Sequence, residues 1–132
     1  MVDFATMRLP ATPTEQAPDG SDVRVLLRGT AGGMAHFELG PGLTSKATRH
    51  RTVEEIWYIV GGRGQMWRKQ GDRSEIVDLD AGTCISIPLG TNFQFRALGY
   101  EPLAAIGLTM PNWPGADEAI QVEGCPEWTP SA

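Results

Sequence analysis

Short runs of β-branched, aromatic and aliphatic residues follow one another at close spacing from residue 23 to residue 110. The runs are VRVLL at 23–27, MAHFEL at 34–39, EIWYIV at 55–60, GQMWRK at 64–69, SEIVDL at 74–79, TCISIP at 83–88, FQFRA at 93–97 and LAAIGLTM at 103–110. Turn signals containing glycine separate many of them, at 32–33, 40–42, 61–62, 70–72 and 81–82. Many short strands with regular turns predict an all-β sandwich or barrel.

The length of 132 residues corresponds to one domain. We divide it into an N-terminal arm at 1–22, a barrel at 23–110 and a C-terminal tail at 111–132, because the two end segments lack periodicity. The tail contains Trp113 and Trp128, which we expect to pack on the barrel or on a partner. The net charge of -5 and the absence of a basic stripe argue against a nucleic-acid partner.

The N-terminus has no apolar segment of signal-peptide length, and no run reaches the roughly 18 apolar residues of a membrane span. We therefore expect a cytoplasmic protein without a membrane partner. Cys84 and Cys125 could form a disulfide, but two free thiols are the preferred interpretation for a reducing compartment.

One stretch supports two local structures. Thr52 followed three residues later by Glu55 has the spacing of a capping box, which would begin a helix. The next residues are the β-forming run IWYIV, and Gly61-Gly62 ends that run. We therefore predict a strand, with residues 52–54 as the corner that leads into it.

Two groups of residues between 42 and 93 match the spacing of a known pair of motifs. The groups are Gly42, His50, Glu55 and Gly62, and then Gly82, Pro88, Gly90 and Phe93. They resemble the two motifs of the cupin superfamily, in which three His and one Glu commonly bind a metal. The four ligand positions fall on Thr48, His50, Glu55 and Phe93. The scaffold positions match, whereas two ligand positions do not.

The resemblance implies a cupin-type double-stranded β-helix, or jelly-roll barrel, with His50 and Glu55 pointing inward. It makes these two residues an incomplete set of ligands for a divalent transition metal, to which His36 would add only if its strand register allowed. It also implies a homodimer. Outward-facing Ile56, Tyr58 and Val60 fit a sheet that a partner covers, because a lone barrel would expose them to water.

Alternation along the strands predicts which side chains share the interior. In EIWYIV, Glu55 and Trp57 lie on one face, and in FQFRA Phe93 and Phe95 do. With Phe93 inward, Gln94 and Arg96 point away, toward the surface or a partner. The expected cavity lining is Thr48, His50, Glu55, Trp57, Phe93 and Phe95, with Gln65 or Met66 closing one side. An apolar pocket with a small polar pole is typical of small-molecule sites.

Three hypotheses for His50 and Glu55 follow. They could bind a metal, as in a metal-dependent oxygenase, although two protein ligands are few for such a site. They could be the general base and acid of a metal-free isomerase, cyclase or lyase, with a nearby carboxylate raising the pKa of His50 and burial raising that of Glu55. They could also hydrogen-bond each other as the remnant of a metal site, in a barrel that only binds a ligand. We prefer a small-molecule-binding barrel with an incomplete metal site.

Overall fold

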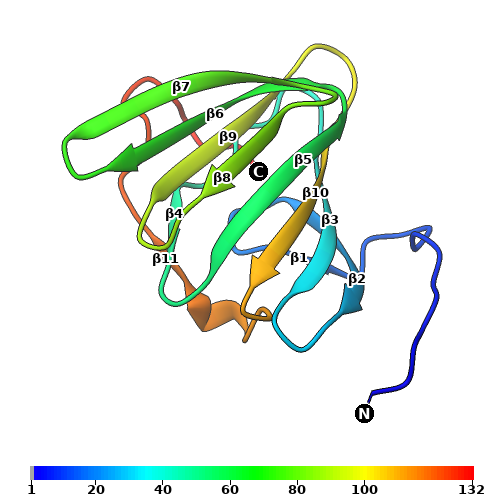
Figure 1. The fold of residues 1–132 in the computed structure, drawn as a ribbon. Coiled ribbons are helices and arrows are strands. Elements are labelled where there is room, and N and C mark those ends of the chain that lie inside the picture. The colour runs from blue at the N-terminus through cyan, green and yellow to red at the C-terminus, as the bar shows by residue number, and fades with distance from the viewer. Residues whose placement is uncertain (1) are drawn as a thin grey trace.

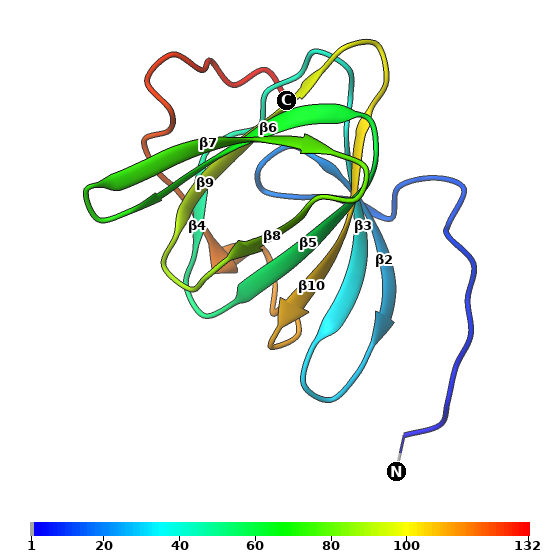
Figure 2. The same cartoon turned by 45° about the horizontal axis from the view of Figure 1, so that its top comes forward.

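A computed structural model describes residues 2–132, which form two antiparallel sheets that face each other (Figures 1 and 2). The six-stranded sheet has the order β1-β2-β3-β10-β5-β8, and the five-stranded sheet has the order β11-β4-β9-β6-β7. The strands are β1 (Glu15–Gln16), β2 (Asp22–Arg28), β3 (Gly33–Leu39), β4 (Thr48–His50), β5 (Glu54–Gly61), β6 (Arg63–Gln70), β7 (Arg73–Asp80), β8 (Cys84–Ile87), β9 (Asn92–Leu98), β10 (Leu103–Met110) and β11 (Ala119–Gln121).

The structure confirms the all-β prediction, and each of the eight predicted runs corresponds to a strand. Three short strands, β1, β4 and β11, were not predicted, because two or three residues are too few to show a period of two. One 3-10 turn, Ala116–Glu118, is the sole helical element within residues 2–132. No helix in this part of the chain is long and apolar enough to cross a membrane.

The corner before β5 explains why the capping-box helix does not form. Glu118, 66 residues further on, accepts hydrogen bonds from the backbone N–H of Thr52 at 2.6 Å and of Val53 at 3.1 Å, and from the Thr52 hydroxyl. A carboxylate distant in sequence therefore takes the role that the capping box assigned to Glu55. This leaves Glu55 free to enter the barrel, and the predicted strand is confirmed.

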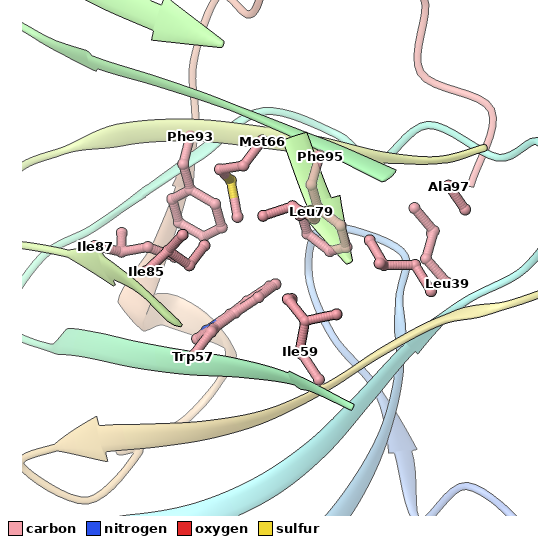
Figure 3. Packing of buried hydrophobic residues seen from close by; sticks show 12 residues of the cluster. Leu39, Trp57, Ile59, Met66, Leu79, Ile85, Ile87, Phe93, Phe95 and Ala97 are labelled. Atoms are coloured by element: carbon pink, nitrogen blue, oxygen red, sulfur yellow. The ribbon is translucent and has the colours of Figure 1, made fainter. Parts of the chain in front are cut away.

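Side chains from both sheets pack together in a hydrophobic core between them (Figure 3). Along β5 buried and exposed residues alternate, so that Trp57 and Ile59 enter the core while Ile56 and Tyr58 face outward. Ile59 and Met66 are completely buried. Removing this apolar surface from water is the main contribution to stability, at about 25 cal/mol per Å². A cavity adjoins this core.

The C-terminal tail packs on the outer side of the five-stranded sheet. The Gln94 side chain accepts a hydrogen bond from the Cys125 amide at 2.9 Å and donates one to the Ser45 carbonyl at 2.9 Å. The Arg96 guanidinium lies 4.5 Å from the centre of a Trp128 ring. Gln94 and Arg96 do point away from the cavity, but the expectation that they lie on a surface or partner face is wrong, because their own chain covers them.

Gly107 in β10 provides the space for an aromatic stack. Phe37 of β3 and Trp57 of β5 lie with ring centroids 5.0 Å apart and planes 18° apart. A Cβ on residue 107 would overlap the Phe37 ring and approach Trp57 Cδ1 to 3.2 Å. The stack therefore depends on the missing side chain.

We predict that Gly107→Ala lowers the free energy of unfolding by about 1–3 kcal/mol, the usual cost of overpacking a core. Gly61→Ala is the matched control, because its Cβ would meet Ala104 Cβ at an ordinary 3.8 Å. Urea denaturation of both variants measures the difference. Equal stability of the two variants would contradict the role of Gly107.

Candidate functional site

A cavity of about 350 Å³ occupies the end of the barrel at which β5 and β9 begin. The six-stranded sheet contributes residues of β2, β3, β5 and β10, and the five-stranded sheet contributes β4, β9 and β11. Segments 15–19 and 112–116 also line it. The structure places five of the expected lining residues on this cavity: Thr48, His50, Glu55, Trp57 and Phe93.

The expected position of Gln65 at the cavity is wrong. β6 pairs with β9 so that Gln65 lies beside Arg96, and its carbonyl accepts hydrogen bonds from Arg96 Nε at 3.0 Å and Nη2 at 2.6 Å. Its amide donates to Asp78 at 3.1 Å, on the side away from the cavity. Phe95 and Met66 do point inward, but they lie deeper, in the core, where Phe95 packs edge-on against Trp57 at 5.0 Å.

Several lining residues were not predicted as part of the site. Phe37 belongs to a predicted strand whose inward face the sequence did not specify. Asp19 and Trp113 come from the segments interpreted as arm and tail, which have no periodicity to indicate a direction. Their location results from tertiary contacts. The one sequence feature that indicated it was the pair of tryptophans in the tail, which we expected to pack on the barrel or on a partner.

Glu55 is the most deeply buried acid of the cavity, with 3% of its surface exposed. Its Oε1 accepts a hydrogen bond from Trp57 Nε1 at 2.8 Å, which is possible because the two residues share one face of β5. Burial raises the pKa of Glu55 to about 8, the Trp57 hydrogen bond opposes this rise, and the charge of Asp19 adds to it. At neutral pH the Glu55 carboxyl is therefore mostly protonated, as predicted from its burial.

His50 is held between aromatic rings. Phe93 and Trp113 lie edge-on to its imidazole, with ring centroids 5.2 Å and 5.0 Å away. Burial lowers the pKa of His50 to about 4, and the charge of Glu118 opposes the shift only in part. The expectation that a neighbouring carboxylate raises this pKa is wrong, because desolvation outweighs the attraction. His50 is neutral at pH 7.

His50 and Glu55 do not form the self-satisfied pair of the remnant hypothesis. Glu55 Oε1 bonds to Trp57, and the buried His50 Nδ1 has no hydrogen-bond partner among residues 2–132. Both side chains border the same cavity and both are neutral at pH 7, because the Glu55 carboxyl keeps its proton and the His50 imidazole has lost its second one. Such a divergence of pKa values is the arrangement that assigns one group as an acid and the other as a base.

The donor set does not fit the four-ligand metal site of the motif. Thr48 and Phe93 occupy two of the ligand positions, and the Phe93 ring has no lone pair to donate. His36 does not line the cavity, because its side chain points to the outer face of the six-stranded sheet, beside Arg24 and Ile106. Nowhere in residues 2–132 do three His, Cys, Asp or Glu side chains gather as metal ligands do. Cys84 and Cys125 are free thiols.

Comparisons with known proteins agree with this architecture. A family model described as a cupin domain matches residues 35–109. An uncharacterized Klebsiella pneumoniae protein with a double-stranded β-helix domain superposes with a TM-score of 0.64 at 17% identity, covering 78% of this chain and 84% of that one. A predicted oxalate decarboxylase of Thermotoga maritima gives 0.65 at 19% identity, covering 80% and 99%. A Bacillus subtilis oxalate decarboxylase mutant gives 0.70 at 17% identity, covering 83% of this chain but 29% of that one. No curated protein matches the chain significantly.

The raised pKa of Glu55 predicts a pH-dependent effect of Glu55→Gln. Between the ordinary pKa of 4.5 and the folded pKa of about 8, the unfolded carboxyl ionises while the folded one keeps its proton. The wild-type protein therefore loses stability relative to Glu55→Gln as pH rises through this window, by at most about 1.4 kcal/mol per pH unit. Above pH 8 the difference becomes constant.

Thermal or urea denaturation from pH 5 to pH 9 measures this difference. The exposed neighbour Glu54 supplies the control, since Glu54→Gln removes the same charge without a buried carboxyl. A difference between wild type and Glu55→Gln that does not change with pH would show that Glu55 is not protonated in the folded protein.

Proposed function

Because the chain belongs to the cupin family, whose domain model matches more than half of it, we propose that it binds a small organic molecule in the barrel cavity. The observation that carries the proposal is Glu55 Oε2. This oxygen belongs to a buried side chain on the cavity wall and has no hydrogen-bond partner among the described residues. The volume of about 350 Å³ and the aromatic walls fit a small metabolite.

Oxalate, named in the descriptions of two compared structures, is not the ligand that this cavity favours. A dianion needs cationic partners when it leaves water. Arg28 is the one Lys or Arg among the lining residues of the described chain, and its Nε donates to Asn112 Oδ1 at 3.2 Å in an exposed position. Asp19 and Glu55 border the same space. We therefore propose a ligand without strong negative charge.

A second candidate function is acid–base catalysis, which the opposite shifts in the pKa values of His50 and Glu55 favour. Neutral His50 accepts a proton from the bound molecule, and protonated Glu55 donates one, which describes an isomerase, cyclase or lyase. No metal is part of this proposal, because the residues present do not complete a metal site.

We expect a screen of aromatic and carbonyl-bearing metabolites to give a ligand that raises the melting temperature. A ligand at a hundredfold excess over its Kd adds about 2.7 kcal/mol of stability. Trp57 and Trp113 line the cavity, so binding also changes tryptophan fluorescence. If the protein is an enzyme, His50→Gln lowers turnover of the ligand about 100-fold or more and preserves binding. Gln65→Ala, outside the cavity, is the control that changes neither.

If the wild-type protein binds the ligand without turning it over, the result would support the binding function and contradict the catalytic one. A ligand whose affinity is unchanged by Thr48→Trp, a substitution that fills the cavity, binds elsewhere and would contradict the proposed site. Circular dichroism of the Thr48→Trp variant checks that it folds.

We also propose that a second copy of the chain covers the outer face of the six-stranded sheet. Leu108 lies between Met34 and Ile56 in one cross-strand row, and Ile106 lies between His36 and Tyr58 in the next. Four of these side chains are large, apolar and 38–51% exposed: Met34, Ile56, Tyr58 and Leu108.

The N-terminal arm favours a second copy as the occupant of this face. Residues 2–9 are exposed, and Figure 1 shows them running away from the barrel beyond β2. Phe4 in this segment is fully exposed, and the arm leaves the barrel where Arg24 Nε donates to the Pro10 carbonyl at 2.9 Å. A twofold partner supplies contacts for both the face and the arm.

Tyr58→Asp is expected to convert the dimer to a monomer, because it places a charge in the centre of the buried face. Light scattering at micromolar concentration measures the mass. Ile76→Asp is the control, since Ile76 is similarly exposed at 47% on β7 of the other sheet. A monomeric wild-type protein, or a dimer that survives Tyr58→Asp, would contradict this interface.

A further inference from the structure

We propose that the barrel cavity recognises an organic cation, an alkylated or primary ammonium group carried on a small molecule. This inference rests on the proposed binding function and names the chemical class of its ligand. It depends on the carboxyl groups, basic side chains and aromatic rings that surround the cavity.

Two buried carboxyl groups from distant parts of the chain border the cavity, together with the exposed Glu15. Asp19 comes from the segment before β2 and Glu55 from the start of β5, and they are 7% and 3% exposed. Asp19 Oδ1 accepts hydrogen bonds from the Ser21 amide at 2.9 Å and hydroxyl at 2.7 Å, and Glu55 Oε1 accepts one from Trp57. Within residues 2–132 no hydrogen bond reaches Asp19 Oδ2 or Glu55 Oε2, so each carboxyl keeps one oxygen for a ligand.

The two carboxyl groups act on each other through the cavity. Burial raises the pKa of Glu55, and the negative charge of Asp19 raises it further. An ammonium group in the cavity gives Asp19 a counter-ion and favours the ionised form of Glu55, which is mostly protonated at neutral pH without a ligand. The attraction is stronger there than between groups in bulk water, because both carboxyl groups are buried.

Positive side chains do not neutralise this end of the barrel. His50 is neutral at pH 7, and Arg28, the one Lys or Arg of the described lining, donates its Nε to Asn112. Burial raises the pKa of Asp19, and the hydrogen bonds from Ser21 and the charge of Lys46, which does not line the cavity, oppose this rise. Glu15 also lines the cavity, in an exposed position. Glu118, which does not line it, has its pKa held below the ordinary value: burial raises it, but hydrogen bonds from Thr52, Val53 and Arg51 outweigh this effect. The cavity therefore has an excess of acidic groups.

Aromatic rings form part of the remaining wall. Phe37, Phe93 and Trp113 all border the cavity together with Trp57. The electron-rich faces of such rings attract ammonium groups, and alkylated ammonium ions suit them because they are weakly hydrated. Carboxylates combined with rings distinguish ligands by charge: an anion is repelled, and an uncharged molecule of the same shape gains only burial.

Isothermal titration calorimetry of the full chain with three probes of similar shape tests the charge preference. The probes are choline, 3,3-dimethylbutan-1-ol, in which carbon replaces the choline nitrogen, and 3,3-dimethylbutanoate, which carries a carboxylate in place of the alcohol. We expect choline to bind about tenfold more tightly than the alcohol and the carboxylate not to bind. Glu55→Gln and Asp19→Asn should each weaken choline binding and leave the affinity for the alcohol unchanged. Glu54→Gln, the exposed neighbour, should change neither.

Binding of the alcohol or the carboxylate as tightly as choline would overturn the cation assignment and leave the cavity as a ligand site. Equal choline affinity in wild type, Glu55→Gln and Asp19→Asn would overturn it as well. Absence of binding by all three probes at millimolar concentration also overturns it, and the metabolite screen then decides independently whether the cavity binds any ligand.

Discussion

The indole of Trp57 contacts both sheets and the cavity at once. It stacks on Phe37 of its own sheet, meets Phe93 and Phe95 of the facing sheet edge-on, and donates its N–H to Glu55. The hydrophobic core and the cavity are therefore not separate regions, because one side chain packs in the first and orients the acid of the second. A well-packed core fixes its side chains in single rotamers. This packing gives the Glu55 carboxyl a defined direction without a second charged group to hold it.

Burial, more than pairing, determines the chemistry of the two central polar residues. In water at neutral pH a carboxyl is ionised and an imidazole is partly protonated. Inside this barrel each becomes neutral, since the walls that surround it are mainly rings and aliphatic side chains. Thr48 and Phe93 stand at two ligand positions of the motif, and this replacement also makes the interior less polar, because it removes metal-ligating side chains and adds a ring. The site therefore resembles an organic-ligand pocket more than a metal centre.

The sequence was sufficient for local structure and for the inward face of β5, because a period of two in EIWYIV leaves one parity once Glu55 is assigned to the interior. It was not sufficient for Gln65, since the side on which Gln65 lies depends on the pairing of β6 with β9, which no local pattern encodes. The same holds for His36, because the sequence did not determine which face of the sheet its side chain lies on. In the structure it lies on the outer face.

Contacts between residues that are distant in sequence were the least predictable part of the site. Asp19 and Trp113 reach the cavity from segments that read as an arm and a tail, and Glu118 replaces Glu55 as the partner of Thr52. The wrong sign for the pKa of His50 has the same origin. The sequence identified charged neighbours as a cause of shifts, but the amount of burial depends on packing by Phe93 and Trp113, which only the tertiary structure shows.

The alternation of β5 places two unrelated surfaces on one strand, with Glu55 and Trp57 facing the cavity and Ile56 and Tyr58 facing outward. A shift of one residue exchanges the faces of a strand completely. In this strand the exchange would put a carboxyl on the apolar outer face and a tyrosine against the core, so both surfaces would be lost together. Insertions and deletions of one residue in β5 are therefore far less tolerable than substitutions, and sequence drift in this segment is confined to changes that preserve its length.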